Sequence, residues 1–93
     1  MLSENYYIVR SQTNGRYLTA HPKPDASVYL LLFKENFDAL SYLNTHAGEL
    51  ANRFAVESLP GTQIKNLLKR WGFSGVGIVK DTLLPNVEFL ENI

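Results

Sequence analysis

The stretch Val28-Tyr29-Leu30-Leu31-Leu32-Phe33 decides the fold, because it is the longest uninterrupted apolar run in this chain of 93 residues. Its apolar residues do not alternate with polar ones, a pattern typical of a strand that is covered on both faces. We therefore expect a strand over residues 28–33 at the centre of a sheet. A run of this length is too short for a transmembrane helix, so no membrane span is expected.

Two further strands are expected before this run. Residues 6–10 and 16–20 are rich in aromatic and β-branched side chains, and Asn14-Gly15 between them accepts the positive φ of a tight turn. These segments predict a hairpin. Pro22 and Pro24 lack the N–H that a ladder needs, so residues 21–27 are expected to form a loop.

Two helices and three strands are expected after the run. Helical spacing of Phe37, Leu40, Leu43 and Ala47 predicts a helix over residues 37–47, which Gly48 ends and residues 49–53 continue irregularly. A second helix over residues 64–71 is predicted by the spacing of Ile64, Leu67, Leu68 and Trp71, with Gly72 just beyond it. The remaining strands are expected at residues 54–59, 76–80 and 87–90.

The resulting order β-β-β-α-β-α-β-β predicts a single α+β domain over residues 1–93. We expect a two-layer sandwich in which both helices cover one face of a mostly antiparallel sheet. Since residues 28–33 supply large apolar side chains to both faces, something must cover the other face. This favours a non-catalytic protein-interaction or regulatory module that forms a homodimer through the uncovered sheet face, with Tyr7, Tyr17 or Tyr29 near the contact.

Composition excludes several classes of function. Nine Lys and Arg balance nine Asp and Glu, so no overall charge attracts the chain to nucleic acid or to an acidic membrane. The chain has no cysteine, which excludes disulfide scaffolds, thiolate catalysis and cysteine-ligated metals. His21 and His46 form no metal-binding spacing, so neither a metal nor a cofactor is expected. A cytoplasmic location follows as the default.

Two alternative functions depend on local groups of residues. Lys65, Lys69 and Arg70 on the second helix are candidates for nucleic-acid binding, although dipole complementation and solubility also explain them. His21 in the proline-containing loop and Asp81 after a strand are candidates for a small-ligand or catalytic site. The simpler interpretation of Asp81 is a residue that opens a turn.

Local phrases also resemble the SseB-type domain, the family of the enhanced serine sensitivity protein. The resemblance covers residues 28–80 and rests on Phe33-Lys34-Glu35-Asn36-Phe37-Asp38-Ala39 and on the segment from Gly72 to Asp81. The Asn-Pro-Gly end of the family's second phrase is missing here. The resemblance implies a small α+β module with a binding or regulatory role and no catalytic machinery to transfer.

Overall fold

The computed structural model describes residues 4–83 and 86–91, and its element order confirms the expected α+β class. None of the helices in these ranges is long and apolar enough to cross a membrane. The expected irregular continuation of the first helix is a 3-10 helix, η1. The elements are β1 (Asn5–Ser11), β2 (Thr19–Ala20), β3 (Tyr29–Leu32), α1 (Asn36–His46), η1 (Gly48–Arg53), β4 (Phe54–Pro60), α2 (Gly61–Trp71), β5 (Gly75–Asp81) and β6 (Asn86–Glu91).

The strands form a four-stranded sheet in the order β2-β3-β5-β6 and a two-stranded sheet of β1 and β4. All neighbouring strands are antiparallel except β3 and β5, which run parallel. The mostly antiparallel character is therefore confirmed. β3 has a partner on each side, which also confirms the central position expected from its apolar run.

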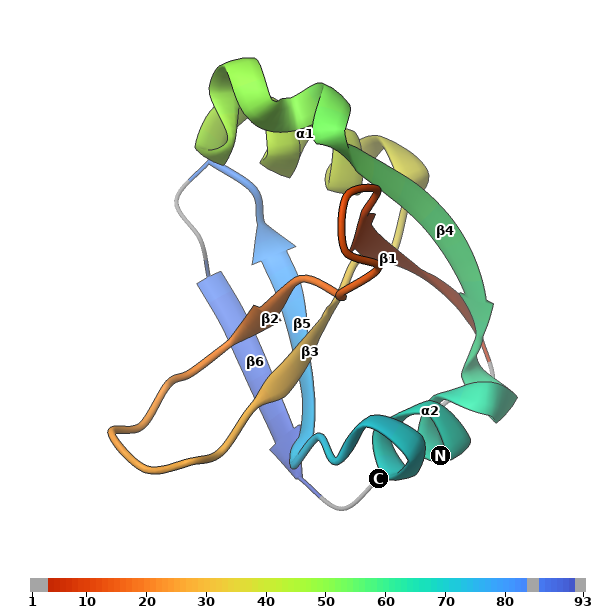
Figure 1. Ribbon diagram of the computed structural model, residues 1–93. Coiled ribbons are helices and arrows are strands. Elements are labelled where there is room, and N and C mark those ends of the chain that lie inside the picture. The colour runs from red at the N-terminus through yellow and green to blue at the C-terminus, as the bar shows by residue number, and fades with distance from the viewer. Residues whose placement is uncertain (1–3, 84–85, 92–93) are drawn as a thin grey trace.

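Backbone hydrogen bonds join the two sheets into one curved surface (Figure 1). Tyr7 and Phe33 exchange both of their N–H···O bonds, at 2.8 and 2.9 Å. The Leu18 N–H donates to the Val9 carbonyl, and the Leu31 N–H donates to the Leu18 carbonyl. The segment after the first turn thus pairs with β1 at its start and with β3 at its end. This change of partner leaves β2 only two residues long, where five were expected.

The apolar core is divided between the two faces of this surface. Consecutive side chains of a strand point to opposite faces, and consecutive residues of β3 belong to different clusters. One cluster contains Leu30 and Leu32 of β3 together with Ile64 and Leu68 of α2. The other contains Leu31 and Phe33 with Ala39 and Leu43 of α1.

The two helices therefore lie on opposite faces of the sheet, and the expectation that both cover one face is wrong. Figure 1 shows α1 and α2 at opposite ends of the molecule, with the strands between them. The reason is the return through β4. This strand pairs with β1 and carries the chain from α1 to the start of α2 on the other side. Each face of β3 is thus covered within one chain.

Candidate functional site

An apolar patch on the outside of α1 is the most exposed group of large hydrophobic side chains in the described residues. Phe37 is 73% exposed, Leu40 46% and Leu83 66%. Phe37 and Leu40 are three residues apart on α1, and Leu83 follows β5. We call these three residues the α1 patch.

Contacts between α1 and the segment after β5 hold the residue before Leu83 against α1. The hydroxyl groups of Ser41 and Thr82 are 3.1 Å apart, and His46 Nε2 donates to the Thr82 carbonyl oxygen at 2.9 Å. The Leu83 N–H donates to Asp81 Oδ1 at 2.9 Å, which holds the turn that presents Leu83. The first two bonds tie the turn to α1.

The orientation of α1 differs from the expected one. Ala39 is 0% exposed and Leu43 is 4% exposed, so this pair at i and i+4 forms the inner face. Phe37 and Leu40, whose spacing with Leu43 predicted the helix, lie on its outside. The spacing of Ala39 and Leu43 is also present in the sequence, but alanine is a weak signal for a buried helix face.

Charges of both signs and an apolar hollow lie close to the α1 patch. Lys34 and Glu35 directly precede α1 and are exposed, whereas Asp38 in its first turn is half-buried. On another side of α1, Tyr42 and Phe54 line a shallow hollow of about 330 Å³. The hollow is lined by no residue of the α1 patch, so the two apolar surfaces are distinct.

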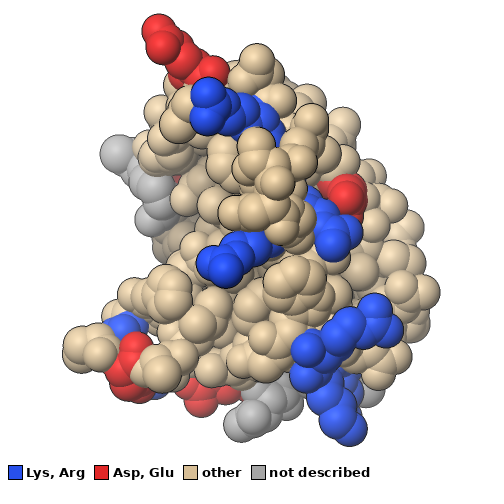
Figure 2. Space-filling view, in the orientation of Figure 1, with Lys and Arg blue, Asp and Glu red and all other residues tan. Residues whose placement is uncertain are grey.

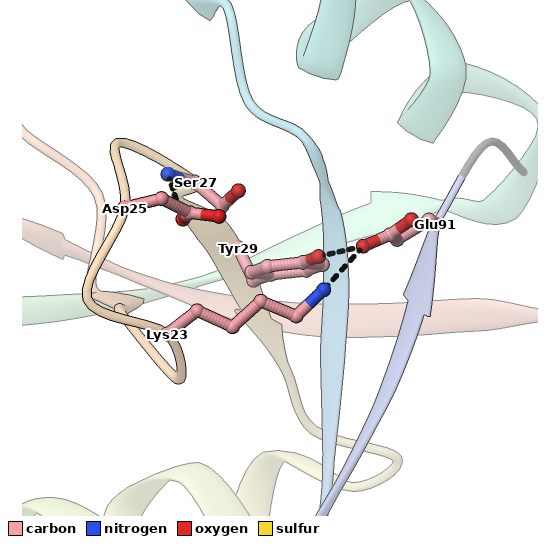
Figure 3. A network of polar contacts seen from close by, with 5 residues as sticks. All are labelled: Lys23, Asp25, Ser27, Tyr29 and Glu91. Carbon is pink, nitrogen blue, oxygen red and sulfur yellow. Dashed lines mark hydrogen bonds and ion pairs between the residues drawn. The ribbon is translucent and has the colours of Figure 1, made fainter.

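The three tyrosines expected at the contact have different surroundings. Tyr29 is 1% exposed, and its hydroxyl donates to the Glu91 carboxylate, which Lys23 approaches from the loop between β2 and β3 (Figure 3). Tyr7 is half-buried and packs against the cluster under α1. Only Tyr17 lies at a surface hollow. The structure does not gather the three on one exposed face.

The hydrogen bond between Tyr29 and Glu91 changes the pKa of both groups. It raises the pKa of Tyr29 to about 12, with a smaller contribution from burial. The same bond, helped by Lys23, lowers the pKa of Glu91. Both effects stabilise a neutral phenol beside a charged carboxylate. The bond joins β3 to β6, and Lys23 ties the loop from β2 to β3 to the same carboxylate.

The basic residues of α2 are exposed but do not surround an aromatic or polar site. Lys65 and Lys69 are one turn apart, so they share a side of the helix. Trp71 follows Lys69 by two residues, or about 200° around the helix, and therefore points elsewhere. Arg70 borders a separate hollow of about 310 Å³.

His21 and Asp81 are not brought together. His21 follows Ala20, whose partner Tyr29 pairs in turn with Gly75 at the start of β5. Asp81 lies at the other end of β5, about 20 Å away at the usual rise per strand residue. The Asp81 bond to Leu83 fits the simpler interpretation, in which Asp81 opens a turn. Within residues 4–83 and 86–91, no group of three or more His, Asp or Glu could hold a metal ion.

Comparisons with protein-family models, with curated proteins and with solved structures gave no match to this chain. The resemblance to the SseB-type domain therefore stays a prediction.

Proposed function

We propose that the protein is a non-catalytic interaction module that associates with a second copy of itself through the α1 patch. The single observation that carries the proposal is the 73% exposure of Phe37, with Leu40 exposed one turn further along the same helix. Exposed apolar surface on a helix marks association sites on soluble domains. The contact differs from the one expected from the sequence, because both faces of β3 are covered by the helices of the same chain.

Charge favours a second copy as the occupant. A two-fold interface places the same surface on both partners, so it must be complementary to itself. Lys34 beside Glu35 and Asp38 provides both signs at the edge of the α1 patch. The formal net charge of zero adds little repulsion between copies. We place this association in the cytoplasm as part of the same proposal, since a chain without cysteine gains nothing from an oxidising compartment.

Sedimentation of the protein and of two matched variants tests the proposal. At tens of micromolar we expect the wild type to sediment at about twice its 10.5 kDa. Phe37→Asp should weaken the dimer at least about tenfold, because a charge replaces an aromatic ring that becomes buried in the contact. Leu50→Asp is the control, since Leu50 is 49% exposed but lies on η1 outside the α1 patch.

Two results would contradict the proposal. A wild-type monomer at about 100 µM, a concentration near the dissociation constant of a weak dimer, would exclude self-association. Equal dissociation of both variants would place the contact elsewhere than at Phe37.

A further inference from the structure

Two surface hollows on a different part of the molecule flank one shared wall, and we call the two hollows together the trough. They measure about 540 and 400 Å³, and the shared wall is the segment from Arg16 to His21. One hollow extends to Arg53 at the end of η1, and the other extends to Trp71 and Phe73 after α2. None of the described residues that line either hollow is acidic. The trough contains no residue of the α1 patch.

Aromatic rings form a row at one end of the trough. The Tyr17 and Trp71 rings meet edge to face with centroids 4.9 Å apart, and the Trp71 and Phe73 rings stack at 6.0 Å. Trp71 is 39% exposed, so part of its ring is available to a ligand. Arg10 lies over the Tyr17 ring at 4.8 Å and donates to the Gly15 carbonyl, which braces this end from behind.

Two arginines provide positive charge along the trough. Arg16 and Arg53 are exposed, and neither forms an ion pair with a carboxylate of the described residues. Hydrogen bonds hold the main chain of both arginines in place. The Ser11 N–H donates to the Arg16 carbonyl and the Gln12 N–H donates to the Arg53 carbonyl, both at 2.8 Å. Figure 2 shows basic side chains over the loop after β1 and over α2, with acidic side chains mainly at the margins of this face.

We infer that the trough binds single-stranded nucleic acid, with Arg16 and Arg53 on phosphates and with Trp71, backed by Phe73, stacking on a base. Sites for single strands combine a positive groove with exposed aromatic rings, and every base offers a face for stacking. A duplex keeps its base faces stacked inside, so it could not use these rings. An acidic peptide would satisfy the arginines but would gain nothing from the aromatic row.

The inferred site is distinct from the basic helix suggested by the sequence. Lys65, Lys69 and Arg70 line neither hollow. The pair Lys65 and Lys69 lies on the side of α2 away from Trp71. A variant that loses the charges of Lys65 and Lys69 is therefore a matched control for a variant that loses two charges from the trough.

Binding of a fluorescein-labelled fifteen-nucleotide oligothymidylate, followed by anisotropy, tests the inference in about 50 mM salt, where phosphate contacts contribute strongly. Trp71 is the only tryptophan in the chain, so its fluorescence reports binding at the trough directly. At this salt concentration one phosphate contact contributes about eightfold, so Arg16→Ala with Arg53→Ala should weaken binding about 60-fold. The slope of log affinity against log salt should fall by about 1.4.

The controls separate the alternatives. Lys65→Ala with Lys69→Ala should change affinity less than about threefold, and Phe37→Asp should leave it unchanged, because neither touches the trough. The inference is overturned by unchanged anisotropy and Trp71 fluorescence, or by a larger loss in the Lys65 and Lys69 variant. Equal affinity for an oligoglutamate peptide or for a duplex would overturn it in favour of those ligands. Unchanged melting temperatures of the variants show that lost binding is not lost folding.

Discussion

The helices α1 and α2 have the same length of eleven residues but different relations to the core. α2 places Ile64 and Leu68 inside, at 1% and 7% exposure, and its opposite side is polar. α1 places Ala39 and Leu43 inside and leaves Phe37 outside. α2 buries Ile64 and Leu68 and leaves Trp71, its last residue, 39% exposed, whereas α1 presents Phe37 and Leu40 to solvent.

The difference shows what determines the orientation of a helix. In α2 the large apolar residues share one side, so only one orientation buries them. In α1 they are spread over a wider arc, and tertiary contacts decide. The small Ala39 lies fully buried against the sheet, and Ser41 and His46 bond to Thr82. We therefore expect substitutions in α2 to affect stability and outward substitutions in α1 to affect association.

The largest effect is expected for Leu68→Ala in α2. Leu68 packs in the cluster with Ile64, so truncation should leave a cavity and lower the free energy of unfolding by about 2 to 5 kcal/mol. Urea titration measures this value. A loss below about 1 kcal/mol would show that this side of α2 does not face the core.

Ala39→Leu tests the inner face of α1. Ala39 has no exposed surface and packs among larger core residues, so three added carbon atoms should cost about 1 to 3 kcal/mol through overpacking. Urea titration again provides the measurement. A variant as stable as the wild type would mean that α1 can rotate, and the contrast between the helices would then be lost.

Much of the fold was predictable because its signals are local. The non-alternating run at residues 28–33 identified the central strand. Gly72, at φ +73°, ends α2 in the left-handed conformation that its position after Trp71 suggested. Both signals depend on residues that are close in sequence.

The placement of the helices and of the candidate sites was not predictable because it depends on distant pairings. The partner change at Leu18, the pairing of β4 with β1 and the bonds to Thr82 join segments far apart in the chain. The three tyrosines of the predicted contact lie in different surroundings for this reason, since Tyr29 packs against Phe89 and bonds to Glu91. Tyr17 and Trp71, 54 residues apart, meet only in the folded chain.

The polar contact at Glu91 joins β3, β6 and the loop from β2 to β3, and it should depend on pH while α1 does not. The pKa of Glu91 is lowered, so its contribution to this contact is complete above about 4.5 and is lost as pH falls through the folded-state value. The pKa of Tyr29 is raised to about 12, so the contribution of its bond to Glu91 is complete below about 10 and is lost as pH rises toward 12. This end of the sheet should be most stable between these limits.

Amide exchange of Ser74 measures the stability of this end of the sheet, because its N–H donates to the Val28 carbonyl beside Tyr29 at 2.8 Å. Exchange, corrected for its intrinsic pH dependence, should accelerate at both extremes, while amides of α1 stay protected. Tyr29→Phe is the control and should remove the alkaline change. Simultaneous loss of protection at Ser74 and in α1 would mean that both regions open as one unit.

The smallest effect on stability is expected for Phe37→Ala, which makes a truncation comparable to Leu68→Ala on the outward side of α1. Phe37 is 73% exposed, so its removal leaves no cavity, and alanine favours the helix at least as well. The free energy of unfolding of a dilute sample should change by no more than about 0.5 kcal/mol.

At higher concentration Phe37→Ala should become less stable than the wild type, because self-association stabilises the folded wild type by mass action. The wild-type urea midpoint should then rise with concentration, whereas the midpoint of Phe37→Ala should stay constant. A loss above about 1 kcal/mol in the dilute sample would contradict the proposed role, since it would mean that Phe37 packs within its own chain.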